Sequence, residues 1–167
     1  MESICKMGEL ITPDKIQPGI LYIDSREPPQ FALLFKDIGS IPVQVAMLET
    51  GDYVYEDICF ERKTIYDFVG SITGKKDKKG RLFAQSDRMV DKYENKFIFV
   101  TQTLEQYDGR VHEHCILGAL ARMLSKGITV CFGIVCEEQF VYLVLKTLEK
   151  IKFKPPEKEA NKNGNHV

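Results

Sequence analysis

The sequence lacks the features of a secreted, membrane-spanning or disulfide-built protein. Its 167 residues contain no apolar run that approaches the length of about twenty residues needed for a membrane helix, and no membrane association is expected. The first residues, Met1-Glu2-Ser3, show no basic segment followed by an apolar stretch, which argues against secretion. The five cysteines are odd in number and form no Cys-x-x-Cys pair. That usage favours reduced thiols in an intracellular protein, cytoplasmic or nuclear depending on the organism.

What is present fits one domain with a mixed sheet. A hydrophobic content of 44% in 167 residues is enough for a substantial core. Short apolar and β-branched runs predict strands over residues 20–23, 41–48, 52–56, 58–62, 97–101 and 128–132. Amphipathic or wholly apolar stretches predict helices over 28–37, 64–72, 81–95, 112–125 and 137–153. This order predicts an α/β fold with a mixed central sheet flanked by helices.

The segment from Gly51 to Asp67 carries the most chemical information. Asp52 begins one predicted strand, Glu61 lies near the end of the next, and Lys63 follows that strand directly. Alternate residues of a strand point to the same face, so Glu61 and Lys63 share a side and Arg62 faces the other. Two carboxylates beside an ammonium group suit a Mg²⁺-dependent phosphodiesterase, because oxygen ligands hold the hard cation and a positive group steadies the attacking water or the phosphate.

Four motifs in this sequence resemble one family. Gly51-Asp52-Tyr53, Glu61-Arg62-Lys63 and then Asp67 are similar to the signature of the XPF family of structure-specific DNA endonucleases, also called ERKxxxD nucleases. The similarity extends upstream to Asp24-Ser25-Arg26-Glu27 and downstream to Gly80-Arg81-Leu82-Phe83 with Gln85. It covers residues 21–100 by motif and, by the order of elements, reaches about residue 150. The resemblance implies a restriction-endonuclease-like fold with metal ligands at one edge of the sheet.

The resemblance divides the chain into three parts. Residues 1–18 are expected to form an N-terminal extension, and residues 19–154 an XPF-type nuclease domain. Residues 155–167 are rich in Lys, Glu and Asn and are expected to be a disordered tail. The segment 74–80, with charged residues between two glycines and no apolar anchor, is expected to be a mobile loop.

The resemblance also implies a metal centre with Asp24, Asp52 and Glu61 as ligands. The expected ion is Mg²⁺, with Mn²⁺ able to substitute. Alternatives remain for each carboxylate: Asp52 fits a turn after a glycine, Asp24 could cap the following helix, and Glu61 could pair with Arg62.

Two basic residues of the motif have proposed catalytic roles. By resemblance, Lys63 orients a water or stabilises charge on the phosphate, although a lysine at a strand end is more often simply exposed. Arg62 is an active-site residue by resemblance, but its opposite direction suits phosphate binding or a structural ion pair.

Asp67 belongs to the catalytic set by resemblance, yet its spacing predicts a different role. Thr64-x-x-Asp67 before an apolar helix is close to a capping box, in which the acidic residue helps to satisfy free backbone N–H groups. We expect Asp67 chiefly to fix the helix start and to position Lys63 or Arg62. Direct metal binding is the less favoured role.

The residues expected to contact DNA are few, because the chain has no excess of positive charge. There are 23 Lys and Arg against 24 Asp and Glu, a net charge of −1. Either basic residues gather on one face, or another domain or subunit supplies most of the affinity. Arg81 and Gln85 lie one helical turn apart and could face phosphates, with an exposed helix surface as the alternative. The full predicted set is Arg26, Lys75, Lys76, Lys78, Lys79, Arg81 and Gln85.

The partners and the competing functions follow from the resemblance. The expected substrate is branched DNA such as a 3′ flap, a fork or a nicked junction, in DNA repair or recombination. The six consecutive apolar residues 140–145 surround a helix, so a homodimer through the C-terminal helix is expected; burial within the domain is the alternative. A helix-hairpin-helix module or another accessory subunit is a further possible partner. Two other functions stay open: a Holliday-junction resolvase, and a catalytically silent DNA-binding subunit.

Overall fold

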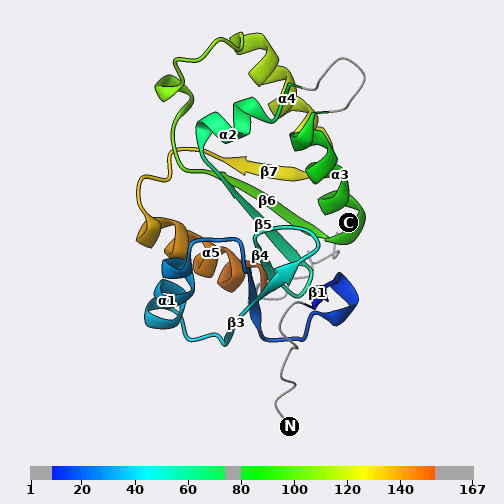
Figure 1. Cartoon of the computed structure of the whole chain (residues 1–167), viewed down its shortest axis with the longest axis vertical. Coiled ribbons are helices and arrows are strands. Elements are labelled where there is room, and N and C mark those ends of the chain that lie inside the picture. Colours follow the sequence, from blue (N-terminus) through cyan, green and yellow to red (C-terminus); the bar gives the residue numbers. More distant parts are fainter. Residues whose placement is uncertain (1–8, 74–79, 153–167) are drawn as a thin grey trace, which may run out of the picture.

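A seven-stranded mixed sheet with helices on both faces forms the centre of the computed structural model (Figure 1), which describes residues 9–73 and 80–152. The strands are β1 (Leu10–Ile11), β2 (Leu21–Asp24), β3 (Val43–Leu48), β4 (Tyr53–Tyr55), β5 (Ile58–Lys63), β6 (Asn95–Val100) and β7 (Ile128–Cys131). The helices are α1 (Pro29–Ile38), α2 (Ile65–Gly70), α3 (Arg81–Lys92), α4 (Glu113–Ser125) and α5 (Glu137–Lys152), with short 3-10 turns η1 (Pro13–Lys15) and η2 (Leu104–Gln106).

The strand order is β1-β3-β2-β4-β5-β6-β7. Strand β4 runs antiparallel to both of its neighbours, β2 and β5, whereas the other neighbouring pairs are parallel. Strands β4 and β5 form a hairpin whose turn contains Glu56 and Asp57, and Glu56 adopts a φ of +52°. Short hairpin turns require such left-handed conformations because they match the twist of the paired strands. The hairpin therefore brings the residue before β4 next to the end of β5.

Side-chain alternation along the strands creates two separate cores. Val54 of β4 and Cys59 of β5 join a cluster covered by α2, α3 and α4. Tyr53 and Phe60 point the other way, into an aromatic cluster covered by α1 and α5. Figure 1 shows the corresponding arrangement, with α2, α3 and α4 grouped apart from the adjacent α1 and α5. By this alternation, the face covered by α2, α3 and α4 carries Val54 of β4 and Cys59, Glu61 and Lys63 of β5.

The predicted order of strands and helices is confirmed, and three short elements were not predicted. Residues 10–15, assigned to the N-terminal extension, contribute η1 and the edge strand β1, in which Leu10 pairs with Met47 of β3. The turn η2 is the third. The mobile loop and the disordered tail were predicted at residues that lie outside the described ranges, apart from Gly80. No helix of residues 9–73 and 80–152 has the length and apolar character needed to cross a membrane.

Candidate active site

Three carboxylates lie in one row across neighbouring strands. Ile23 of β2 pairs with Tyr53, and Tyr53 pairs with Phe60. One step further along these registers, Asp24, Asp52 and Glu61 follow one another across β2, β4 and β5. The backbone N–H of Asp24 donates to the Asp52 carbonyl (2.8 Å), and the N–H of Asp52 donates to the Phe60 carbonyl (2.9 Å). All three side chains belong to the face that α2, α3 and α4 cover, as the two cores require.

Asp24 is the most fully engaged of the three. Its side chain is 1% exposed and accepts a two-armed contact from Arg26, with Nε at 2.7 Å from Oδ1 and a terminal nitrogen at 2.8 Å from Oδ2. The backbone N–H groups of Arg26 and Leu48 complete the shell. Burial acts to raise the pKa of Asp24, but the hydrogen bonds from Arg26 and from these backbone groups outweigh it and leave the pKa below its ordinary value.

Asp52 has the opposite electrostatic situation. Its Oδ2 accepts a hydrogen bond from the backbone N–H of Arg62 at 2.8 Å. Burial first, and then repulsion from the charges of Glu61 and Glu27, raise the pKa of Asp52 well above its usual range. A cation close to Asp52 would therefore favour the charged form of this carboxylate.

Glu61 is 6% exposed and receives two donors on one oxygen. The Lys63 ammonium lies 3.0 Å from Glu61 Oε1, and Nε2 of Gln85 on α3 donates to the same oxygen at 3.0 Å. The expected common face of Glu61 and Lys63 is confirmed by their contact. Gln85, which was predicted to face DNA phosphates, instead turns its amide toward Glu61.

Arg62 lies on the opposite face of the sheet in a structural ion pair. Its Nε donates to Glu27 Oε2 at 2.7 Å, and its guanidinium packs 4.7 Å from the centre of the Phe31 ring. The hydroxyl of fully buried Tyr53 donates to the same Glu27 oxygen at 2.5 Å. The sequence motifs contained both Glu27 and Tyr53, but sequence reasoning assigned neither of them a role. Because alternation along the strand turns Arg62 to the second face, the sequence did indicate that its charge needs an acidic partner there.

Asp67 lies in the first turn of α2 and is not part of the row. Thr64 is the N-cap residue: its hydroxyl accepts from the backbone N–H of Asp67 at 3.1 Å and donates to Asp67 Oδ2 at 2.9 Å. Asp67 is exposed. The helix starts where the spacing predicted, but the Asp67 carboxylate accepts from the Thr64 hydroxyl and not from a backbone N–H group among the described contacts.

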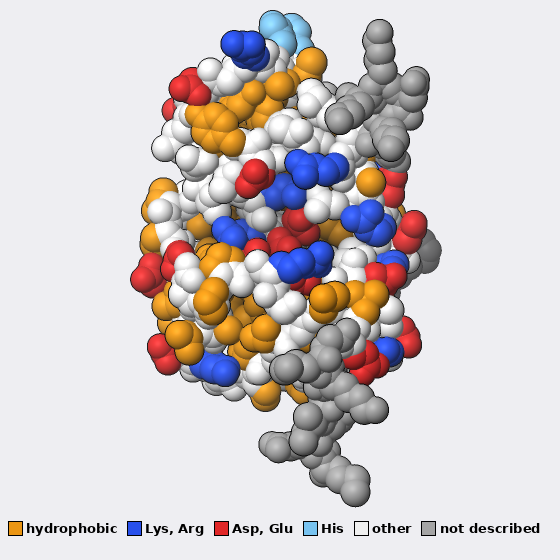
Figure 2. All heavy atoms as spheres, viewed as in Figure 1, with side chains coloured by type: hydrophobic (Ala, Val, Ile, Leu, Met, Phe, Trp, Pro, Cys, Tyr) orange, Lys and Arg blue, Asp and Glu red, His pale blue; other side chains and the backbone are white. Residues whose placement is uncertain are grey.

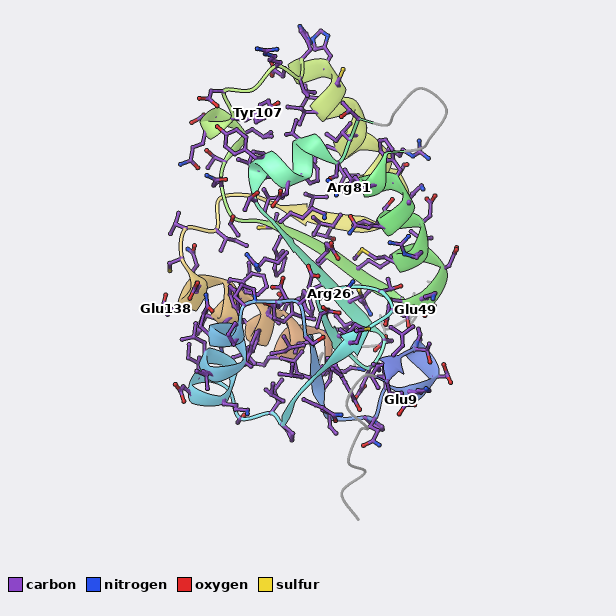
Figure 3. All side chains as sticks on the ribbon, viewed as in Figure 1. Glu9, Arg26, Glu49, Arg81, Tyr107 and Glu138 are labelled. Carbon is purple, nitrogen blue, oxygen red and sulfur yellow. The ribbon has the colours of Figure 1, made fainter. Side chains whose placement is uncertain are left out.

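Positive side chains surround the carboxylates on the surface. Figure 2 shows acidic atoms in the middle of this face with Lys and Arg side chains around them, and Figure 3 places Arg26 and Arg81 on this same face. The side chain of Arg26 is 69% exposed although it pairs with Asp24. The hydrogen bond to Asp24, together with the charges of Asp52 and Glu61, raises the pKa of Arg26. On this face, positive side chains therefore lie close to the carboxylates although the net charge of the chain is −1. Lys75, Lys76, Lys78 and Lys79 lie outside the described residues.

The donor set of Asp52 and Glu61 fits a hard divalent cation. Each carboxylate has one oxygen occupied by the contacts above, and its second oxygen accepts no hydrogen bond from the residues that the structure describes. The side-chain oxygen of Gln85, beside Glu61, is buried without a partner in the same part of the chain. No group of three or more His, Cys, Asp or Glu side chains within residues 9–73 and 80–152 forms a ready metal site. Asp24, the third predicted ligand, is paired with Arg26.

The fold belongs to the restriction-endonuclease-like class, a mixed sheet flanked by helices with acidic residues at the ends of central strands. Residues 23–132 match the ERCC4 domain. The structure is similar to that of XPF from Aeropyrum pernix, with 30% identity, a TM-score of 0.60, and coverage of 81% of this chain and 65% of that one. It is also similar to XPF from Aeropyrum pernix in complex with DNA, with 30% identity, a TM-score of 0.62, and coverage of 86% and 69%.

The chain belongs to the ERCC4 domain family as an XPF-type nuclease domain. It spans less than two thirds of the first of these XPF chains. No curated protein sequence matches it significantly.

Proposed function

We propose that this chain is a Mg²⁺-dependent endonuclease that hydrolyses phosphodiester bonds in branched DNA during repair or recombination. The observation that carries the proposal is the pair Asp52 and Glu61, side by side on one face with the Lys63 ammonium 3.0 Å from Glu61. The likeness to an XPF structure in complex with DNA supports DNA as the substrate. A 3′ flap, a fork or a nicked junction is the preferred structure within this proposal.

The residues of the chain divide the work of hydrolysis. Asp52 and Glu61 would hold the divalent cation, which when bound polarises the phosphate and favours the ionised form of a water. Lys63, fixed by Glu61, places a positive charge beside the point of attack, where it orients water and stabilises charge that develops on the phosphate. Arg26, exposed beside the row, is placed to contact a neighbouring phosphate.

The test is cleavage of labelled flap, fork and four-way junction DNA in the presence of Mg²⁺ or Mn²⁺. We expect the wild type to cut and Asp52→Ala to lose activity by at least 100-fold, since catalytic charge stabilisation is worth factors of about 10²–10³. Asp91→Ala, which removes an exposed carboxylate from α3, is the control and keeps full activity. Cleavage by Asp52→Ala at the wild-type rate would refute the proposal. Symmetric cuts across the four-way junction would favour the resolvase, and binding without cleavage the silent subunit.

We also propose that the chain forms a homodimer through α1 and α5. The six-residue apolar run of α5 buries Phe140, Val141 and Val144 in the aromatic core, but leaves Tyr142 57% exposed. Leu33 and Ile38 of the neighbouring α1 are 61% and 44% exposed. Exposed apolar groups on adjacent helices support a protein interface. A helix-hairpin-helix module or another accessory subunit remains part of the proposal as a further source of DNA affinity.

Sedimentation velocity at micromolar concentration tests the dimer. We expect the wild type to sediment as a dimer and Leu33→Glu to shift it to the monomer, because a charge would be buried at the interface. Leu124→Glu is a matched control, since Leu124 on α4 is equally exposed at 61% on the other side of the sheet. A monomeric wild type, or an equal response to both substitutions, would contradict the interface.

A further inference from the structure

Gln85 makes a long-range contact that neither helix packing nor DNA binding explains. It lies on the first turns of α3, and its Nε2 donates to Glu61 Oε1, 24 positions earlier in the chain, at 3.0 Å. The same Glu61 oxygen accepts from Lys63 at 3.0 Å. Gln85 on α3 therefore restrains Glu61 on β5, the carboxylate that we place in the cation site.

The other end of the same amide is left without a partner. Oε1 of Gln85 is fully buried and accepts no hydrogen bond from the described residues. Only one other buried side-chain atom in this part of the chain, Oγ1 of Thr50, shares that condition. Buried polar atoms in native proteins nearly always have a partner, and the exceptions often mark a functional site or an absent water or ion.

The chemistry of the neighbours fixes the direction of this amide. If it were reversed, its oxygen would face the Glu61 carboxylate and its NH₂ group would be buried without an acceptor. The observed orientation places the NH₂ group on the carboxylate and leaves the oxygen as the free end. A free acceptor next to the Glu61 carboxylate attracts a hydrogen-bond donor or a positive ion.

We propose that Gln85 is a positioning residue for a hydrated divalent cation. Its NH₂ group holds Glu61 in place, and its buried carbonyl oxygen accepts a hydrogen bond from a water of the hydrated cation that Asp52 and Glu61 bind. This inference rests on the proposed function and deepens it, since it assigns a residue of α3 to the cation site. A leucine would fill the same space between α3 and β5, so packing alone does not require an amide here.

The first measurement is titration of the full chain with Mn²⁺ by calorimetry, in the absence of DNA. We expect Gln85→Leu to weaken Mn²⁺ binding by about tenfold or more, the usual effect of removing a residue that orients metal ligands. The control is Gln30→Leu. Gln30 also donates from its amide to a glutamate, Glu137, at 3.0 Å, but on the exposed surface of α1. Gln30→Leu is expected to bind Mn²⁺ as the wild type does.

A second variant separates the acceptor from the shape of the side chain. Gln85→Glu keeps an acceptor oxygen at the same position but replaces the NH₂ donor to Glu61 with a second carboxylate. Only the acceptor half of the role survives, so its Mn²⁺ affinity at pH 8 is expected to lie above that of Gln85→Leu. A merely structural glutamine would give another pattern, in which both Gln85 variants lower the melting temperature and neither changes Mn²⁺ affinity. That pattern, or Mn²⁺ binding by Gln85→Leu within twofold of the wild type, overturns the inference.

Asp52→Asn in the same titration distinguishes the two levels of the argument. If Asp52→Asn loses Mn²⁺ binding while Gln85→Leu keeps it, the cation site stands and the role of Gln85 is wrong. If Asp52→Asn binds Mn²⁺ like the wild type, the cation site itself is misplaced, and the proposed function fails together with the inference.

Discussion

Asp52 occupies a position that disfavours its charged form. Burial and the charges of Glu61 and Glu27 raise its pKa in the folded protein. A carboxyl group with a raised pKa in the folded state contributes stability below its unfolded pKa of about 4, and that contribution is lost as the pH rises through the higher value. The metal-free protein is therefore destabilised by Asp52 at neutral pH, and a bound cation would remove the penalty.

Asp52→Asn is accordingly predicted to stabilise the metal-free protein. At pH 8 in EDTA the free energy of unfolding should rise, because the substitution removes a charge that the folded protein disfavours. The gain should shrink as the pH falls toward 4, because wild-type Asp52 then becomes protonated in the folded state and partly protonated in the unfolded state. Urea unfolding at the two pH values measures this difference. Asp91→Asn serves as the exposed comparison, and a loss of stability in Asp52→Asn at pH 8 would show that the charge is not strained.

At the same scale, the sequence predicted contacts between near neighbours and missed those across the fold. The strand period placed Glu61 and Lys63 together, and the spacing of Thr64 and Asp67 predicted the cap. The contact between Gln85 and Glu61 depends on where α3 crosses β5, which no local pattern specifies. The pairing of Arg62 with Glu27 likewise needs the start of α1 to lie over the end of β5.

At the scale of elements, α2 follows β5 directly and packs on the same face of the sheet as Glu61 and Lys63. The start of α2 depends on a cap in which two side chains take part. Thr64 follows Lys63 directly, so the geometry that begins α2 also ends β5. Isoleucine and phenylalanine side chains of α2 are fully buried against the sheet. The cap thus holds the end of the strand that carries Glu61 and Lys63.

A double-mutant cycle tests the cap. Thr64→Ala is predicted to lower the free energy of unfolding by about 1 kcal/mol, the usual cost of removing an N-cap side chain. Asp67→Ala should cost less in the Thr64→Ala background than alone, because the two side chains share one hydrogen-bonded unit. Strict additivity of the two substitutions in urea unfolding would mean that the cap does not act as a unit.

The elements themselves could be predicted because their hydrophobic patterns are long enough to read. Strand β5 and helix α5 each show a clear apolar run with turn residues at its ends. Strand β1 has two residues and η2 three, too few to show a period. Their formation depends on partners elsewhere, as in the pairing of Leu10 with Met47.

At the scale of the whole molecule, charge distribution matters more than net charge. Acidic atoms occupy the middle of one face, and positive side chains lie around them (Figure 2). Under the proposed function, such an arrangement would let cations enter the centre while the phosphate backbone of DNA contacts the surrounding residues. A chain with a net charge of −1 can then bind DNA through a few residues.

The salt dependence of DNA binding tests this distribution. Neutralising Arg26 or Arg81 to Gln is predicted to weaken binding and to reduce the slope of log K against log salt by about one for each phosphate that the protein no longer binds. Lys146→Gln is the control, because Lys146 is an equally charged residue on α5, paired with Glu149, on the other side of the sheet. Equal slopes for the wild type and both arginine variants would exclude these residues from the DNA interface.

The alternation along β5 also limits how this domain tolerates changes of length. Inserting or deleting one residue between Cys59 and Lys63 would exchange the two sides of the motif, because the side-chain period of a strand is two. Arginine would then lie beside Asp52, and the glutamate would be pressed into the aromatic layer. An insertion of two residues would keep each side chain on its original face but would move the glutamate out of register with Asp52. A substitution in this strand therefore changes one side chain, whereas a change in its length moves the following side chains to other positions on the sheet.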